Sequence, residues 1–427
     1  MDKIKSIWVL LSEDAVQCCN ENSTSLEHGK NLMSLELFAK IAERVAENSW
    51  KCTVLCNSSG IPKEYLKLCD TMQAQIIMPA EHKGVITDSA RTTLVFDSNQ
   101  MDLTSQRPAA SQAILRLRRD HISQLSEIVS ALLDHFSNIS IRHPDLLSYN
   151  DEDIVAYKDE LLKIGLWLLS KKELWSRYRI DCLTDRFQLD AVNECGAGVK
   201  SIAVGPAGEL YLCPACIHHK QLSYGHIMEN LKIPNRQLLT REYSVPCGQC
   251  ESLHCSRCVF LNKRSTFEFC VPARNVCRLT HFEMEAQSWL AQEAIKMGLW
   301  NEQYKLPNPP TVYDPYELTE KGEETLLVAA TWRTLVKFTG RSKDLQPSTM
   351  LEIIHGLQGW CLALVKCAEA GYAPSAKTIE NDILASLRRN TIEQYRNTVF
   401  QEGCPTVHQI ELLMCEAANK TLNCNIS

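Results

Sequence analysis

The sequence predicts an α/β fold: a partial TIM-barrel-like parallel sheet with covering helices, then a small cysteine-rich metal domain, then an all-α bundle. Three observations predict this order. Strand-length apolar runs alternate with helically periodic segments over residues 1–190, nine of the 20 cysteines fall between Cys195 and Cys277, and the pattern is helical from about residue 317. Alternating strands and helices are typical of a parallel sheet, and a chain of 427 residues has room for several domains.

The N-terminal elements follow from the spacing of apolar residues. Short aliphatic runs predict strands, and apolar residues that recur every three to four positions predict helices. The expected strands are 6–12, 51–57, 74–79, 92–98, 111–119 and 137–143, with 179–187 closing the series. The expected helices are 34–49, 61–72, 122–136 and 151–175. The basic stretch 116–121 is expected to be a solvated strand end rather than a site for an acidic peptide.

Charge and hydropathy limit the kinds of partner that we expect for this protein. The net charge of −6 argues against a nucleic-acid-binding surface and gives no attraction to anionic membranes. The apolar run near the N-terminus is too short for the core of a signal peptide, and no run approaches the roughly 20 apolar residues of a membrane span. We therefore expect a soluble, cytoplasmic protein that binds neither nucleic acid nor membrane.

The segment 195–277 breaks the alternation, because glycine, proline and cysteine dominate it. No long helix is expected there, and one follows near 279–298. An apolar core this thin predicts that bound metal supplies much of the folding free energy. A Pro-rich linker comes next, and the helical remainder carries no chemical motif. The expected domains are 1–190, 191–300, 301–316 and 317–427.

The cysteines outside that segment lie mostly on apolar patterns. In a chain without a signal peptide, thiols are expected to stay reduced, and clustered thiols bind metal more often than they form disulfides. The eleven scattered cysteines are expected to be small buried side chains for the most part. They are Cys18, Cys19, Cys52, Cys56, Cys69, Cys182, Cys361, Cys367, Cys404, Cys415 and Cys424.

A tight hairpin is expected inside the cysteine-rich segment. Residues 201–204 and 209–212 have strand character and flank the turn "GPAG". Pro206 presets φ for a turn position, and Gly208 tolerates the positive φ that follows. A hairpin of this kind brings the two ends of the segment together.

The hairpin ends carry the first candidate metal ligands. Cys195 lies just before the first strand and Cys213 just after the second, so both thiolates are expected to reach one metal site, and Cys216 adds a third at CxxC spacing. A second group has the spacing C-x2-C-x4-C-x2-C, which favours a four-sulfur site. Its members are Cys247, Cys250, Cys255 and Cys258, with Cys270 and Cys277 as possible closing ligands.

Three histidines near these cysteines, His218, His219 and His254, are expected to be surface residues or neighbours of the site rather than ligands. Zinc and iron–sulfur clusters both accept four thiolates, so the spacing leaves the metal open. The order C-x12-G-x4-C, a gap, then a dense four-cysteine run and a further cysteine resembles the SPASM domain. That domain lies C-terminal to the barrel in many radical S-adenosylmethionine peptide-modifying enzymes and holds auxiliary [4Fe-4S] clusters.

The resemblance implies one or two [4Fe-4S] clusters, with zinc as the alternative. Two intervals in the second group are x4 and x2, where that family usually has x5 and x3, so the assignment of ligands to clusters stays open. By analogy, one cluster takes Cys195, Cys213 and Cys258, with Cys216 as a further candidate. The other takes Cys247, Cys250, Cys255 and either Cys270 or Cys277.

A closer resemblance covers about residues 1–300. The motifs "CLTDRF", "IAVGPAGELYLCPA", "GQCESLHCSRCVFLNKRST" and "PARNVCRLTHFE" look like those of the CXXX repeat peptide maturases. That family occurs beside ribosomally made peptides with repeated cysteines. The resemblance implies two partners, a cysteine-rich precursor peptide and a radical S-adenosylmethionine enzyme.

The radical-generating motif C-x3-C-x2-C is absent from the chain. Cys52 and Cys56 have the first interval, but Ser59 stands at the third position, and the loop after the first strand offers only the adjacent Cys18 and Cys19. Neither a phosphate-binding loop nor a nucleophile elbow is present, so no catalytic residue or further cofactor site is assigned.

Three hypotheses follow from these observations. The first is an iron–sulfur accessory protein of peptide maturation that binds a precursor peptide, a radical enzyme or both. The second is a peptide-modifying enzyme that acts through an auxiliary cluster with an open iron. The third is a zinc-stabilised interaction module without redox chemistry.

Overall fold

The computed structural model describes residues 4–300 apart from short gaps. The gaps are 22–30, 83–87, 101–109, 111, 186–188, 190–191, 220–221, 230–232, 234–235, 242–246, 248–249, 251, 267–268, 270–271 and 273. The expected linker at 301–316, the expected all-α domain at 317–427 and the candidate ligand Cys270 lie outside the described residues.

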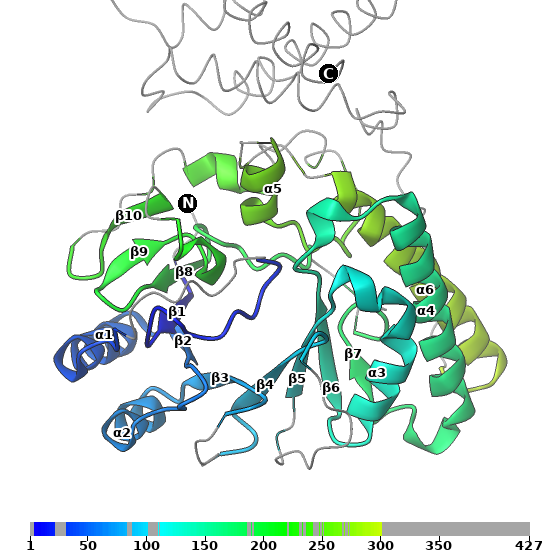
Figure 1. Cartoon of the computed structure of the whole chain (residues 1–427), viewed down its shortest axis with the longest axis horizontal. Helices are drawn as coiled ribbons and strands as arrows, with labels where there is room; N and C mark the ends of the chain where they lie inside the picture. The colour runs from blue at the N-terminus through cyan, green and yellow to red at the C-terminus, as the bar shows by residue number, and fades with distance from the viewer. Residues whose placement is uncertain are drawn as a thin grey trace, which may run out of the picture. The chain divides into compact units, whose positions relative to one another are not determined.

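A ten-stranded, mostly parallel sheet forms the centre of the described fold (Figure 1). Its strands are β1 (Ser6–Leu10), β2 (Lys51–Leu55), β3 (Gln75–Pro79), β4 (Thr92–Asp97), β5 (Gln112–Arg116), β6 (Asn138–Arg142), β7 (Arg179–Ile180), β8 (Ser201–Val204), β9 (Glu209–Tyr211) and β10 (Ser223–His226). Their order in the sheet is β10-β9-β8-β1-β2-β3-β4-β5-β6-β7. Neighbours from β8 to β7 in that order are parallel, whereas β8–β9 and β9–β10 are antiparallel. The sheet confirms the expected α/β class.

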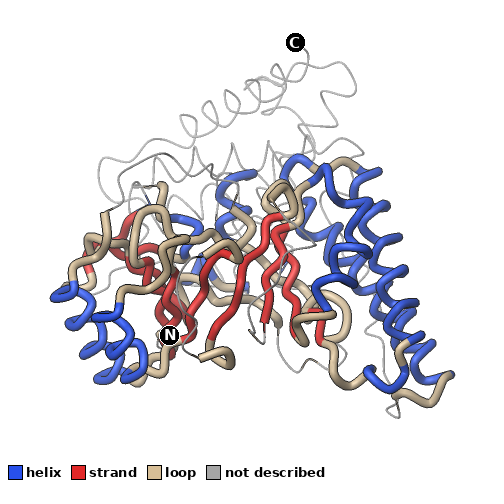
Figure 2. The backbone as a smooth tube through the Cα atoms, turned by 60° about the horizontal axis from the view of Figure 1, so that its bottom comes forward, coloured by secondary structure: helices blue, strands red, loops and turns tan. Residues whose placement is uncertain are grey.

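Six α-helices accompany the sheet in the described part of the chain (Figure 2). They are α1 (Leu35–Asn48), α2 (Lys63–Thr71), α3 (Leu125–Leu133), α4 (Asp151–Ser170), α5 (Val259–Thr266) and α6 (Arg274–Lys296). Helices α3, α4 and α6 lie side by side, and α1 and α2 lie together elsewhere along the sheet (Figures 1 and 2). No described helix has the length and apolar character needed to cross a membrane.

The first and fourth helices show why these segments are helical. The Ser34 hydroxyl accepts a hydrogen bond from the backbone N–H of Leu37, which caps α1, and four apolar residues at helical spacing turn one face into the core. Asn150 and Asp153 form a reciprocal capping box at the start of α4. Tyr157 of α4 then donates a hydrogen bond to Glu283 of α6 at 3.1 Å, inside the core.

Three helices differ from the sequence-based expectation. The helix expected over 122–136 is α3, Leu125–Leu133, which follows a 3₁₀ segment at Arg119–Gln124. The long helix expected over 151–175 ends at Ser170, and a short 3₁₀ turn follows it. The helix expected to begin near 279 begins at Arg274, two residues after Pro272, so that Cys277 lies on α6. Helix ends depend on capping and tertiary contacts that apolar periodicity does not encode.

The described residues fall into two compact units. The first covers those within Met1–Ile233, Ser252–Phe260 and Asn275–Pro309, and it contains the whole sheet. The second covers those within Pro234–Glu251 and Leu261–Arg274. The hairpin of the cysteine-rich segment belongs to the first unit because β8 pairs with β1 in parallel, with Ser6 opposite Ser201. The four expected domains stay a prediction.

Candidate metal centre and adjoining cavity

The expected hairpin is confirmed. Strands β8 and β9 pair antiparallel with Ala203 opposite Tyr211. The turn is closed by the N–H of Gly208, which donates to the carbonyl of Gly205 at 2.9 Å. Gly208 has φ +91°, the left-handed backbone region that its place in the turn requires. Continuing this register two residues beyond the pair Ala203 and Tyr211 places Ser201 opposite Cys213.

Cys195 is held beside the base of this hairpin. The Ser201 hydroxyl donates to the carbonyl oxygen of Cys195 at 3.0 Å. Glu194, the preceding residue, forms an ion pair with Arg257 at 3.0 Å between Oε2 and Nε. Because Arg257 precedes Cys258, this ion pair fixes two cysteine-bearing segments against each other. The Arg257 side chain is only 4% exposed, so removing its partner would leave a buried charge.

Cys213 lies at the centre of a group of thiols. Its Sγ is 3.5 Å from the Sγ of Cys216. The hydrogen bond with Cys216 raises the pKa of the Cys213 thiol, burial raises it further, and so do the negative charges of Cys216, Cys19 and Cys258. Thiols from two further expected ligand positions, Cys216 and Cys258, therefore lie within electrostatic reach of Cys213, and so does Cys19 of the loop after β1.

Cys195 belongs to the same neighbourhood. Burial raises the pKa of its thiol, the charge of Cys19 raises it further, and Arg257 lowers it in part. Other atoms of Cys195 keep exposed surface. All of these cysteines are free thiols in the structure.

The remaining candidate ligands are described less completely. In the second unit, the N–H of Cys250 donates to the carbonyl of Cys247 at 3.1 Å, and Arg241 donates to the same carbonyl at 2.9 Å. Cys255 and Cys277 are partly buried residues of the first unit. Within the described ranges, no three His, Cys, Asp or Glu side chains stand close enough to hold one metal ion. The full ligand set stays a prediction.

Five scattered cysteines in the described part of the chain have the buried environment that the sequence predicts: Cys18, Cys52, Cys56, Cys69 and Cys182. Cys52 on β2, Cys56 just after it and Cys69 on α2 are each at most 3% exposed. Burial raises the pKa of each thiol to about 12, so all three stay protonated and behave as small apolar groups.

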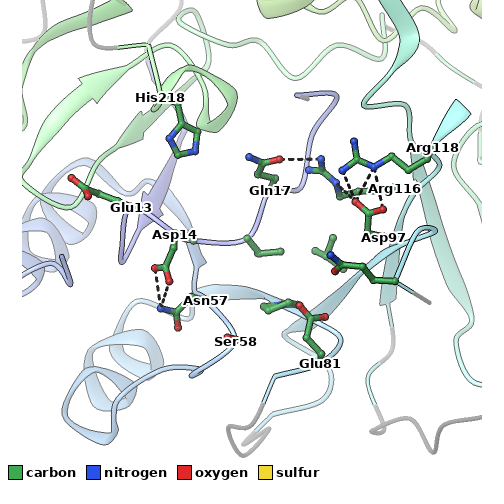
Figure 3. A pocket seen from close by; sticks show the side chains of 15 residues that line it. Glu13, Asp14, Gln17, Asn57, Ser58, Glu81, Asp97, Arg116, Arg118 and His218 are labelled. Carbon is green, nitrogen blue, oxygen red and sulfur yellow. Dashed lines mark hydrogen bonds and ion pairs between the residues drawn. The ribbon is translucent and has the colours of Figure 1, made fainter. Parts of the chain in front are cut away.

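A cavity of about 490 Å³ opens at the carboxyl ends of the parallel strands (Figure 3). Binding sites of parallel α/β sheets lie at this end, because the loops that follow the strands converge there. The residues after β1, β2 and β3 form one wall, and the ends of β4 and β5 form the other. The lining residues are Glu13, Asp14, Ala15, Val16, Gln17, Asn57, Ser58, Pro79, Glu81, Val95, Asp97, Gln100, Arg116, Arg118 and His218.

An ion-pair network forms the arginine wall of the cavity. Arg116 contacts Glu21 at 3.4 Å and Asp97 at 3.5 Å, and it donates to the side chain of Gln17 at 3.0 Å. Arg118 donates to Asp97 at 2.7 Å. Arg116 is only 3% exposed, so the expectation of a solvated strand end at 116–121 is wrong for this residue. The reason is that its acidic partner lies on a loop 95 residues earlier in the chain.

The opposite wall is acidic. Asn57 donates to both carboxylate oxygens of Asp14, at 3.0 and 3.2 Å. Glu13 and Glu81 lie around the same opening, and His218 lies across from Asp14 (Figure 3). A cavity with acidic groups on one wall and paired arginines on the other is suited to a polar ligand or to a polar side chain of a peptide.

Asp97 gives the network a pH dependence. Burial alone would raise the pKa of Asp97, but hydrogen bonds from Arg118 and the charges of both arginines hold it below its ordinary value. Stability from this carboxylate is therefore fully present above the unfolded pKa of about 3.9 and is lost as pH falls through the folded pKa. We expect Asp97→Asn to lower the free energy of unfolding, measured by urea denaturation. The difference from the unaltered protein is expected to become smaller below about pH 4. A gap that does not change with pH would contradict this.

Sequence reasoning missed the network and the place of Cys19. Asp97 and Arg116 stand at the ends of two expected strands, and the strand-end rule for parallel sheets was a signal that could have found them. Cys19 was set aside because its spacing from Cys18 fits no metal motif. Its charge nevertheless raises the pKa of both Cys195 and Cys213, an effect that the sequence does not show.

Comparison with known proteins does not assign this chain to a family. No protein-family model and no curated protein matches the chain. Among solved structures, the crystal structure of Streptococcus suis SuiB bound to the precursor peptide SuiA is similar, with 10% identity and a TM-score of 0.43 over 64% of this chain and 76% of that chain. SuiB bound to S-adenosylmethionine gives 11% identity and a TM-score of 0.41 over 64% and 77%. A likeness at this level does not establish a family for this protein.

Proposed function

We propose that this protein is an iron–sulfur protein of ribosomally synthesised peptide maturation. In this proposal Cys195, Cys213 and Cys258 hold a [4Fe-4S] cluster together with a fourth thiolate. The supporting observation is that thiols from separate segments raise the pKa of the Cys213 thiol, and that these cysteines remain free of disulfides. Thiolates packed this closely repel one another, and a cationic centre offsets that repulsion.

The donor set fits an iron–sulfur cluster by its chemistry. Clusters of this type are held by cysteine thiolates, and thiolates are what these segments supply. When bound, such a cluster provides a redox-active or Lewis-acidic centre, while the chain positions the sulfurs and screens them from solvent. Cys247, Cys250, Cys255 and either Cys270 or Cys277 are the proposed ligands of a second cluster.

The peptide-maturation role is supported by the resemblance to the CXXX repeat peptide maturases. It implies a cysteine-rich precursor peptide and a separate radical S-adenosylmethionine enzyme as partners, because the chain itself lacks C-x3-C-x2-C. A polar side chain of such a peptide would fit in the cavity at the strand ends. His218, which lines this cavity, lies two residues after the candidate ligand Cys216. A reduced compartment such as the cytoplasm suits both the thiols and the cluster.

Anaerobic purification followed by metal and sulfide analysis tests the proposal. We expect iron and acid-labile sulfide in equal amounts, with broad visible absorbance that reductant bleaches. A colourless protein with stoichiometric zinc and no sulfide would overturn the iron–sulfur assignment. Adding S-adenosylmethionine and reductant to the isolated protein is expected to give no cleavage, and cleavage would instead favour an enzyme with an open iron.

One observation favours zinc as the second candidate. Two thiolates on a tetrahedral zinc ion with bonds of about 2.3 Å lie about 3.8 Å apart. The Sγ atoms of Cys213 and Cys216 are 3.5 Å apart, near that spacing. The same metal analysis therefore decides between an iron–sulfur centre and a zinc-stabilised module.

A further inference from the structure

The cavity at the carboxyl ends of the strands carries an excess of negative charge. Its lining includes two arginines, and the carboxylates outnumber the cations even if His218 carries a proton. Clefts lined by charge of one sign raise the local concentration of ligands of the opposite sign. The lining therefore favours a cationic ligand over an anionic one. The four carboxylates belong to Glu13, Asp14, Glu81 and Asp97.

The two arginines of the cavity are already engaged by carboxylates of the protein. Nε and Nη2 of Arg118 donate to Asp97 at 3.1 and 2.7 Å, and its Nη1 lies 3.5 Å from a carboxylate oxygen of Asp145. Arg116 is buried and is paired in the same way with Asp97 and Glu21. Each guanidinium group therefore faces two carboxylates, and an anionic ligand would have to break these pairs to reach it.

Two carboxylates of the cavity stand outside this network. Glu13 lies in the loop after β1 and Glu81 in the loop after β3, and within the described residues neither forms an ion pair. The two side chains lie apart from each other at the opening (Figure 3). A bare metal ion needs several oxygen ligands at about 2.0–2.6 Å from one point. Carboxylates spread around an opening suit an organic cation better, because its body fills the space between them.

Apolar side chains share the lining with these carboxylates. They are Ala15, Val16, Pro79 and Val95. The side chains of lysine and arginine pack their aliphatic stems along apolar surface while their charged heads reach polar groups. The cavity of about 490 Å³ is within the size range of pockets that enclose small ligands, so it has room for one such side chain.

We propose that the cavity binds a basic side chain, of lysine or arginine, that the precursor peptide presents. The aliphatic stem contacts the apolar lining, and the acidic side chains at the opening hold the cationic head. The assignment of this side chain to a precursor peptide rests on the proposed function above. The charge of the ligand follows from the cavity alone.

Titrations followed by saturation-transfer NMR test the inference on the anaerobically purified full chain with three probes. Nα-acetyl-lysine methylamide is expected to bind. Its Nε-acetylated form has lost the charge and is expected to bind about tenfold more weakly. n-Pentylamine keeps the stem and the charge but lacks the backbone groups of a peptide residue, so it is expected to bind more weakly than the lysine probe. Equal binding of n-pentylamine would replace the peptide residue by a free amine.

Charge-removing variants localise the binding to the cavity. Glu13→Gln and Glu81→Gln are each expected to weaken the lysine probe by about threefold. The matched control, Glu43→Gln, removes an exposed carboxylate on α1 that does not line the cavity, and it is expected to leave binding unchanged. Circular dichroism on each variant must match that of the unaltered protein.

The outcomes separate this inference from the proposed function. Equal affinity for the charged and the acetylated probe, no binding of the lysine probe, or the same loss in Glu43→Gln as in Glu81→Gln would overturn the inference. The iron content of the same samples tests the proposed function independently. A protein that carries no iron but binds the lysine probe through Glu13 and Glu81 would refute the iron–sulfur assignment and confirm the charge of the ligand.

Discussion

Replacing Cys213 by alanine is expected to remove the cluster of the hairpin site and with it a large part of the stability of the cysteine-rich segment. The Cys213 sulfur lies 3.5 Å from that of Cys216, and the charges of Cys19 and Cys258 also raise the pKa of its thiol, so its loss removes the proposed ligand with the most thiol neighbours. Structural metal sites in small domains contribute on the order of 10 kcal/mol to folding. We therefore expect Cys213→Ala to lose one cluster's iron and sulfide, measured chemically, and to unfold at markedly lower urea concentration.

Cys69→Ala is the matched control for this experiment. Cys69 is a fully buried cysteine on α2, and it is not among the groups whose charges raise the pKa of Cys195 or Cys213. Its replacement is expected to leave the iron and sulfide content unchanged. Equal iron loss in both variants, or full iron retention in Cys213→Ala, would contradict the proposed ligand role.

Replacing Arg116 by methionine is the second change with a large expected effect. The Arg116 and Glu21 side chains are 4% and 3% exposed, so the variant leaves the Glu21 carboxylate buried without its cation. Breaking a buried ion pair by removing one partner costs about 3–5 kcal/mol. We expect a loss of this order in the free energy of unfolding from urea denaturation.

Two comparisons make the Arg116 result specific. Lys40→Ala breaks the exposed pair between Lys40 and Glu36 on α1, and it is expected to leave the stability unchanged within measurement. Adding Glu21→Gln to Arg116→Met is expected to recover part of the loss, since the buried charge is then gone. No recovery in the double variant would show that packing, rather than the unpaired carboxylate, accounts for the cost.

Much of the fold could be predicted because its signals are local. The strands β1–β6 and the helices α1 and α2 fall within the segments where apolar spacing placed them, and Gly208 marks its turn by its own backbone preference. Helix ends were less accurate. The helix expected to run to residue 175 ends at Ser170, because capping and tertiary contacts set that boundary.

The candidate site was harder to predict because its contacts join distant parts of the chain. The pairing of β8 with β1 joins residues about two hundred positions apart, and the Arg116–Glu21 contact joins residues 95 positions apart. No local pattern reports such contacts. The hairpin predicted that Cys195 and Cys213 reach one site, and the SPASM resemblance added Cys258. This ligand set stays a prediction.

The Mössbauer spectrum of anaerobically purified, iron-labelled protein tests the central claim most directly. The account predicts quadrupole doublets of mixed-valence iron in [4Fe-4S] clusters, with one cluster's share missing in Cys213→Ala. A spectrum of isolated ferrous iron alone, or a protein that carries zinc and no iron, would contradict it.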